Sequence, residues 1–304
     1  MSQTLLSIKV DVDTDRGTRI GVPHLLALFD EFRVKATFLF SLGPDNTGRA
    51  IKRIFRPGFL SKVSRTSVVS IYGIRTLLNG LLLPGPHIGR RNEGVMRAVR
   101  EMGHETGIHC YDHTRWQDGL ARMTRTEVFE EFGMARKEFE RIFHEPATTA
   151  GTAGWQANGF SLAANDDAGL LYASDSRGTG PFYPQVGSTV YKTLQVPTTL
   201  PTIDELLGRS EFPEDRIVDH YLSLLRPAAP NILTIHAEIE GMKKIVLFRA
   251  FLTRMRSRSV EIVRLDELAR ELLRNPSAVP ICDLVPGTIE GRSGTLAVQK
   301  GRNA

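Results

Sequence analysis

The sequence has little cysteine, no long hydrophobic run and, over one long stretch, no acidic residue. Its two cysteines, Cys110 and Cys282, lie far apart and are too few for a disulfide framework, which predicts free thiols and a reducing compartment. No apolar run approaches the ~20 residues that a membrane-spanning helix needs. Residues 1–13 carry acids where a signal peptide keeps an apolar core, so we expect the chain to stay in the cytoplasm.

Acidic residues are absent between Asp45 and Glu93, where nine lysines and arginines occur. A second stretch without acids, between Glu240 and Glu261, holds six more basic residues. Outside these two stretches acids outnumber bases, although the whole chain of 304 residues carries a net charge of +5. The positive charge is therefore local.

Within the first stretch, residues 51–83 mix isoleucine, leucine, valine, phenylalanine and tyrosine with basic side chains. This composition favours the interface of an anionic bilayer, where apolar side chains are buried and basic ones lie among headgroups. The alternative is an insertion that packs on the fold and presents a solvated basic face. Nucleic acid is not the expected partner, because the interleaved residues are mostly aliphatic rather than stacking aromatics.

The composition, with 41% hydrophobic and 24% charged residues, is that of a globular protein. Strand-like and helix-like segments alternate along the chain, which predicts an α/β protein. Strands are expected at residues 5–11, 34–40, 104–109, 147–151, 170–175, 194–196 and 231–236, followed by a last strand and helix over 260–275. About seven strand–helix repeats indicate a barrel rather than an open sheet.

Two segments depart from this alternation. Residues 46–92 are far longer than an ordinary βα loop, which predicts a functional insertion. Residues 276–304 contain three prolines and several glycines, which is typical of an irregular tail. We therefore expect one catalytic domain over residues 1–275, with a basic, apolar insertion at 46–92 and an irregular tail at 276–304.

Candidate reactive side chains fall at the carboxyl ends of the predicted strands, where βα folds place their active sites. They are Asp11 and Asp13 after the first strand, His109 and His113 at the third, Asp175 at the fifth and His236 at the seventh. One carboxylate and two histidines spaced i, i+4 can hold a divalent metal ion and leave positions open for water and substrate. The pattern predicts a hydrolytic metal site.

Each of these features also has an ordinary explanation when it is taken alone. The two aspartates can cap the turn after a strand, and two histidines at this spacing arise by chance in many chains. A single histidine such as His236 is more often a hydrogen-bonded core residue than a catalyst. The metal site is favoured because all four features lie at strand ends of the same polarity.

The order of these motifs resembles the polysaccharide deacetylase family of metal-dependent carbohydrate deacetylases, over residues 5 to about 275. The resemblance is carried by SIKVDVDT, GHETGIHCYDHTRWQD, AGTAGWQAN, YASDSRG and ILTIHAEIEG. It implies a single-domain α/β fold, a distorted (β/α)7 barrel. It also implies that Asp11 is the catalytic base, that Asp13, His109 and His113 bind the metal, that His236 is the general acid, and that Asp175 orients His236.

The sequence departs from the family at one motif. Family members carry an Arg-x-Pro-Tyr-like motif after the fourth strand, and its arginine supports the catalytic base. This chain has Thr152-Ala153-Gly154-Trp155 there, which leaves open how Asp11 is held. We expect Trp155 and Tyr111 to bind the sugar.

The resemblance implies an amide hydrolase with one divalent ion, which can be zinc, manganese, cobalt or nickel. Its narrower form implies that the substrate is undecaprenyl-phosphate-linked 4-deoxy-4-formamido-L-arabinose, deformylated for aminoarabinose modification of lipid A and polymyxin resistance. Such a substrate predicts a peripheral protein on the cytoplasmic face of the bacterial inner membrane. The alternatives are a deacetylase of another N-acyl amino sugar and a membrane-binding module without catalysis.

Overall fold

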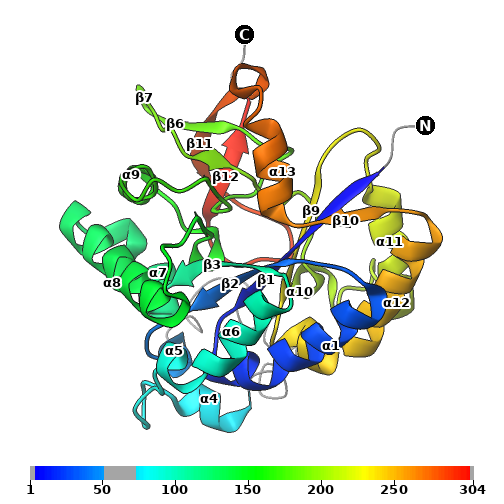
Figure 1. Ribbon diagram of the computed structural model, residues 1–304, viewed down its shortest axis with the longest axis horizontal. Helices are drawn as coiled ribbons and strands as arrows, with labels where there is room; N and C mark the ends of the chain where they lie inside the picture. The colour runs from blue at the N-terminus through cyan, green and yellow to red at the C-terminus, as the bar shows by residue number, and fades with distance from the viewer. Residues whose placement is uncertain (1–3, 51–72, 302–304) are drawn as a thin grey trace.

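The computed structural model describes residues 4–50 and 73–301, and a curled parallel sheet with helices around it forms its centre (Figure 1). Eight strands of the described residues make up this sheet. They are β1 (Leu5–Val12), β2 (Thr37–Ser41), β3 (Glu105–Cys110), β4 (Thr149–Ala150), β5 (Tyr172–Ala173), β8 (Leu194–Gln195), β9 (Asn231–His236) and β10 (Glu261–Val263).

Strand β1 is central to the sheet because it pairs with three other strands. It pairs with β9 through residues 6–11, with β2 through residues 9–12 and with β10 through residues 5–7, always in parallel. From β2 the order continues through β3, β4 and β5 to β8. The chain after β8 returns to β9, where the backbone N–H groups of Thr199 and Leu200 donate to the carbonyl of Ile232. The predicted α/β, barrel-like curl is therefore confirmed.

Helices cover the outside of the curl (Figure 1). Those of the described residues are α1 (Val22–Phe32), α4 (Ile74–Leu78), α5 (Ile88–Arg91), α6 (Glu93–Glu101), α7 (His113–Gly119), α8 (Arg125–Phe143), α9 (Gly159–Asp167), α10 (Ile203–Leu206), α11 (Ile217–Leu224), α12 (Ile245–Ser257) and α13 (Leu265–Leu272). The longest, α8, begins at a capping box in which Thr124 and Glu127 bond each other's backbone N–H groups.

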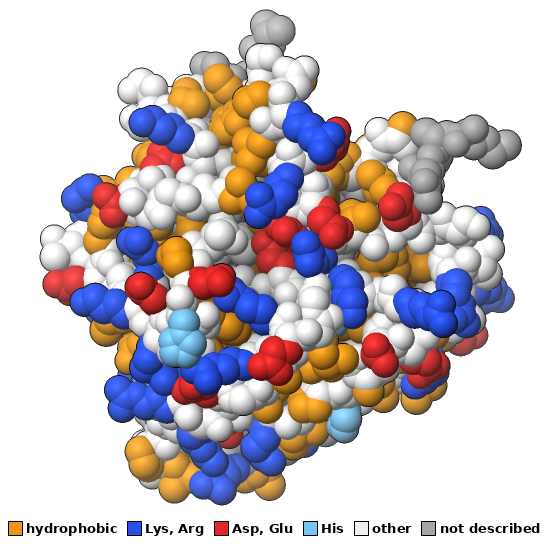
Figure 2. All heavy atoms as spheres, viewed as in Figure 1, with side chains coloured by type: hydrophobic (Ala, Val, Ile, Leu, Met, Phe, Trp, Pro, Cys, Tyr) orange, Lys and Arg blue, Asp and Glu red, His pale blue; other side chains and the backbone are white. Residues whose placement is uncertain are grey.

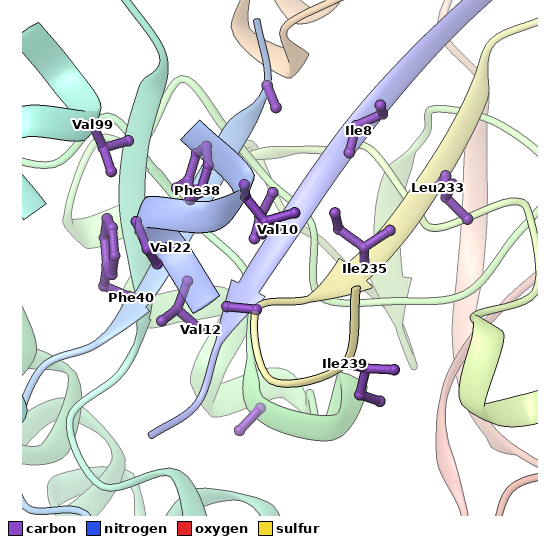
Figure 3. Close-up of a cluster of buried hydrophobic side chains, with 14 of the residues drawn as sticks. Ile8, Val10, Val12, Val22, Phe38, Phe40, Val99, Leu233, Ile235 and Ile239 are labelled. Atoms are coloured by element: carbon purple, nitrogen blue, oxygen red, sulfur yellow. The ribbon is translucent and has the colours of Figure 1, made fainter. Parts of the chain in front are cut away.

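The main core lies between the sheet and these helices, as Figure 3 shows. Val10 and Val12 of β1 are completely buried there, near Phe38 of β2. Successive side chains of a strand point to opposite faces. Lys9 and Asp11 therefore point to the other face of β1, the inside of the curl. This alternation separates an apolar layer under the helices from a polar interior that leads to the site.

A second sheet of four strands contradicts the expected irregular tail. Within the described residues it runs β12-β11-β6-β7, from β6 (Tyr183–Val186), β7 (Thr189–Val190), β11 (Ile281–Gly287) and β12 (Leu296–Lys300). The prediction is wrong for residues 281–287 and 296–300, where β11 pairs antiparallel with β12 and parallel with β6. Pro286 is tolerated because β6 pairs only with residues 281–283 of β11.

Residues 51–72 of the expected insertion lie outside the described residues. The described remainder contains α4 and α5 and is fastened beside the carboxyl ends of the strands. The Asp45 carboxylate accepts a hydrogen bond from the backbone N–H of Asp15 (3.1 Å), and the Asn46 amide donates to Asp112 (2.6 Å). No helix in the described ranges combines the length and apolarity needed to cross a bilayer. Both cysteines are free, as expected, and both are buried.

Candidate active site

Asp11 and His236 lie side by side on neighbouring strands. They are register partners in the β1–β9 ladder, and the backbone N–H of Ala237 donates to the Asp11 carbonyl (3.0 Å). Asp11 is 3% exposed, whereas His236 is partly exposed. The parallel pairing of two strand ends thus places the predicted base beside the predicted acid.

Asp13, His109 and His113 form a group that can hold a metal ion. One ligand atom from each lies within 4.8 Å of the other two. The Asp13 Oδ1 atom is 3.3 Å from Nε2 of His109 and 3.5 Å from Nε2 of His113. His109 is the penultimate residue of β3 and His113 begins α7, so the bend between these elements aims both imidazoles at Asp13.

The hydrogen bonds around this group suit a metal site. Nδ1 of His109 lies 2.6 Å from the Gly151 carbonyl, which fixes the tautomer with the proton on Nδ1 and leaves Nε2 free as a ligand. Asp13 Oδ1 is buried and accepts no hydrogen bond from the described residues. Burial alone would raise the pKa of Asp13, but the imidazoles of His113 and His109 hold it well below its usual range. A divalent transition metal prefers an anionic carboxylate and imidazoles as donors, and its binding would release the protons that the imidazoles carry in its absence.

The loop that carries Asp13 is held by a residue that the sequence reasoning missed. Oε1 of Glu238 accepts hydrogen bonds from the backbone N–H groups of Asp13 (3.1 Å) and Thr14 (2.9 Å) and from the Thr14 hydroxyl (2.7 Å). A Cβ atom at Gly17 would collide with this carboxylate, so glycine is needed there. Burial and the charge of Asp13 raise the pKa of Glu238 well above its usual range. The signal in the sequence was an acid two residues after His236.

Asp11 is also held by a residue that was not predicted. Oδ2 of Asp11 lies 3.4 Å from Nζ of Lys9, which is completely buried. Burial lowers the pKa of Lys9, and the charge of Asp11 opposes that shift. The other oxygen of Asp11, Oδ1, is buried without a hydrogen-bond partner among the described residues. It is free to accept a proton.

Asp175 is completely buried after β5, and its carboxylate accepts three side-chain or backbone hydrogen bonds. The donors are the Thr152 backbone N–H (2.9 Å), the Asn165 amide (2.7 Å) and the Gln195 amide (3.0 Å). Burial raises the pKa of Asp175, although these donors oppose the shift. Within the described residues no hydrogen bond or ion pair joins Asp175 to His236, whose Nδ1 atom is buried without a partner. Orientation of His236 by Asp175 stays a prediction.

Trp155 and Tyr111, the expected sugar-binding residues, occupy different environments. Trp155 is only 2% exposed, and its indole N–H donates to the Thr198 hydroxyl (3.1 Å). Tyr111 is partly exposed, and its hydroxyl lies 3.4 Å from Nε2 of His87 at the border of the insertion. A sugar can therefore reach Tyr111 more readily than Trp155, and binding by either side chain stays a prediction.

The sequence is similar to curated bacterial proteins over nearly its whole length. It is 36% identical to the "Probable 4-deoxy-4-formamido-L-arabinose-phosphoundecaprenol deformylase ArnD" of Shewanella sediminis (strain HAW-EB3), over 97% of this chain and 95% of that protein. It is 32% identical to the protein of the same name from Wigglesworthia glossinidia brevipalpis, over 93% of this chain and 98% of that one. No protein-family model matches the sequence.

The fold is similar to that of solved polysaccharide deacetylases. The crystal structure of a probable polysaccharide deacetylase from Pseudomonas aeruginosa PAO1 superposes with a TM-score of 0.60 at 16% identity, covering 90% of this chain and 92% of that one. At this identity the likeness concerns the fold alone. It confirms the predicted barrel of the deacetylase type.

Proposed function

Because the chain belongs to the family of 4-deoxy-4-formamido-L-arabinose-phosphoundecaprenol deformylases, we propose that it removes the formyl group from undecaprenyl-phosphate-linked 4-deoxy-4-formamido-L-arabinose. The proposal is carried by one observation: Asp11 and His236 stand as neighbours beside the group of Asp13, His109 and His113. The product is the 4-amino sugar, which serves aminoarabinose modification of lipid A and thereby polymyxin resistance.

The reaction needs a base, an acid and a polarising ion. Asp13, His109 and His113 would hold a divalent ion, which would lower the pKa of a bound water and polarise the formamide carbonyl. Asp11 accepts the proton of the attacking water at Oδ1, as the water oxygen bonds to the formamide carbon. His236 donates a proton to the sugar nitrogen as the C–N bond breaks, because an unprotonated amine is a poor leaving group. Formate and the free amine leave the site.

The donor set limits the choice of metal without fixing it. Two imidazoles and a carboxylate suit zinc, and they also suit manganese, cobalt and nickel. We propose one such ion per chain. Titration of metal-free protein with each of the four ions, followed by activity, identifies the one that the enzyme uses.

A comparison of acyl groups tests the proposed substrate against the alternative of a deacetylase. The lipid-linked sugar is prepared in two forms that differ only in carrying a 4-formamido or a 4-acetamido group. We expect at least about tenfold higher kcat/KM for the formamide, since a pocket fitted to formyl excludes the extra methyl group. Formate and acetate release are measured side by side, and an equal or higher rate of acetate release contradicts deformylation as the function.

We further propose that the enzyme acts as a peripheral protein at the cytoplasmic face of the inner membrane, in contact with anionic lipid. The support is a patch near α4 that consists of Ile74, Leu81, Leu82 and Leu83, which are 67%, 46%, 76% and 39% exposed. Figure 2 shows hydrophobic and basic side chains together at the lower edge of the molecule, where Figure 1 places α4. Exposed apolar side chains with basic neighbours are typical of an interfacial contact.

Sedimentation with vesicles tests this contact. We expect the protein to bind vesicles of phosphatidylglycerol and phosphatidylethanolamine, and to be released as salt is raised. Leu82→Ser is expected to weaken binding, whereas Val190→Ser, at a position 44% exposed on the second sheet, leaves it unchanged. Equal binding of the two variants, or none by the wild-type protein, contradicts this contact.

A further inference from the structure

A lysine is completely buried two residues before the predicted base. Lys9 is 0% exposed, and lysine is almost never fully buried unless it is paired. Its position in β1 explains the burial, because residues 9 and 11 point to the same inner face of the strand. The strand therefore delivers an ammonium group and a carboxylate to one place.

The contacts of the Lys9 ammonium direct it at Asp11. Nζ lies 3.4 Å from Oδ2 of Asp11 and 3.3 Å from the Ser174 carbonyl. In the described part of the chain, no other lysine or arginine makes an ion pair with Asp11. The Asp11 carboxylate thus has one oxygen facing a fixed positive charge, while Oδ1 has no hydrogen-bond partner there.

The segment after β4 has no arginine that could support Asp11. Its residues pack around Lys9 instead. A Cβ atom at Gly151 would lie 2.5 Å from Leu39 Cδ1 and 3.0 Å from the Ser174 carbonyl oxygen, so glycine lets this segment pack closely beside Lys9. The indole of Trp155 lies beneath it, with Nζ 5.2 Å from the ring centroid. A cation over a desolvated indole is stabilised by the ring quadrupole. The residues that replace the family's arginine motif therefore form the wall of a lysine site.

We propose that Lys9 is the positioning residue for the catalytic base in this chain, and that it holds Asp11 with Oδ1 directed at the attacking water. From its position on β1, Lys9 gives Asp11 the support that comes from an arginine after the fourth strand in the family that this sequence resembles. Among the described residues Lys9 makes no hydrogen bond or ion pair with the metal ligands Asp13, His109 and His113, so we expect its removal to act on the base rather than on metal binding.

This role rests on the proposed deformylase reaction, and kinetics of the full chain on the formamido lipid test it. We expect Lys9→Met to lower kcat about 100-fold by misplacing the base, with little change in KM or in the affinity for Co²⁺ alone. Lys9→Arg, which keeps the charge, is expected to recover most of that loss. Arg292→Met is the matched control, because Arg292 lies 4.5 Å over the same indole and makes its ion pairs with Asp204 and Glu205.

A double variant separates positioning from a merely structural effect. In the Asp11→Asn background, Lys9→Met is expected to cause no further loss of kcat, because the carboxylate that it serves is gone. The double variant also stays measurable if Lys9→Met alone unfolds, since it leaves no unpaired buried carboxylate.

The possible failures are distinguishable. If the wild-type protein with metal releases no formate, the proposed function fails. If the wild-type protein is active and Lys9→Met matches it within threefold, or if folded Lys9→Arg is as inactive as Lys9→Met, the role of Lys9 is overturned. An additive loss in the double variant overturns it as well.

Discussion

At the scale of single residues, the site depends on buried side chains that fix the backbone of the reactive ones. Glu238 illustrates this, because one of its oxygens accepts three hydrogen bonds from the Asp13–Thr14 turn. Motif spacing identifies ligands such as Asp13, His109 and His113 through their chemistry. It does not identify Glu238, whose role follows from a contact between residues 225 positions apart.

Substitutions of Glu238 test whether this contact sets metal affinity. Glu238→Gln keeps the accepting oxygen and should bind metal like the wild-type protein. Glu238→Met removes the acceptor and should weaken metal binding roughly 10- to 100-fold, the usual effect of losing a residue that orients a ligand. Calorimetric titration with Co²⁺ measures both. Wild-type affinity in a folded Glu238→Met protein would show that the turn is held by other means.

At the scale of the elements, the end of the sheet opposite the site is tied together by Glu105 at the start of β3. Its Oε2 atom accepts hydrogen bonds from the Thr37 hydroxyl of β2 (2.6 Å), the Tyr172 hydroxyl of β5 (2.7 Å) and the Asp266 backbone N–H of α13 (3.1 Å). Burial, with a contribution from the charge of Asp266, raises the pKa of Glu105 from 4.5 to about 7. The folded protein therefore holds this carboxyl neutral under mildly acidic conditions.

The raised pKa predicts a dependence of stability on pH. The contribution of Glu105 is fully present below pH 4.5, its unfolded pKa, and is lost as the pH rises through about 7. The loss is of the order of 3 kcal/mol at most. Glu105→Gln mimics the neutral form, so its stability relative to wild type should rise between pH 5 and pH 8. Urea unfolding at both values measures this, and a constant difference contradicts the assignment.

The second sheet is the element that sequence patterns missed. Its strands bury Leu284 and Leu296, and β12 fastens the loop after β5, since the Arg177 N–H donates to the Ala297 carbonyl (3.0 Å). Prolines and glycines in residues 276–304 indicate irregular structure locally. The strands form because β6, about 100 residues earlier, offers an edge to pair with, and no local pattern reports such a partner.

Deletion of residues 276–304 tests the structural role of this sheet. The loss of buried leucine side chains alone should lower stability by at least about 3 kcal/mol. Activity should fall as well, because β12 no longer holds the loop that follows Asp175 through its backbone hydrogen bonds with Arg177. Removal of residues 302–304 is the control. A truncated protein that melts at the wild-type temperature would instead support the prediction from the sequence that residues 276–304 form an irregular tail.

At the scale of the whole molecule, features that depend on local sequence patterns could be predicted, whereas features that depend on contacts between residues distant in the sequence could not. The α/β class, the long strands and the capped helix α8 follow from local periodicity and caps such as Thr124. The grouping of the reactive residues could be predicted because they lie at strand ends, which a parallel sheet brings together. The contact between Lys9 and Asp11 could not be predicted, because a lysine in a strand is normally expected to be solvent-exposed. Lys9 is buried only because the sheet curls around it.

The most direct test of deformylation is mass spectrometry of the lipid-linked formamido-sugar after incubation with metal-loaded protein. The wild-type enzyme should convert the lipid to a species lighter by one CO, as formyl is replaced by hydrogen. Asp11→Asn and His236→Ala, each checked for folding and metal binding, should convert the lipid at least about 100-fold more slowly. If the wild-type protein leaves it unchanged with zinc, manganese, cobalt and nickel, or if both variants convert it at the wild-type rate, the assignment of base and acid to this site is contradicted.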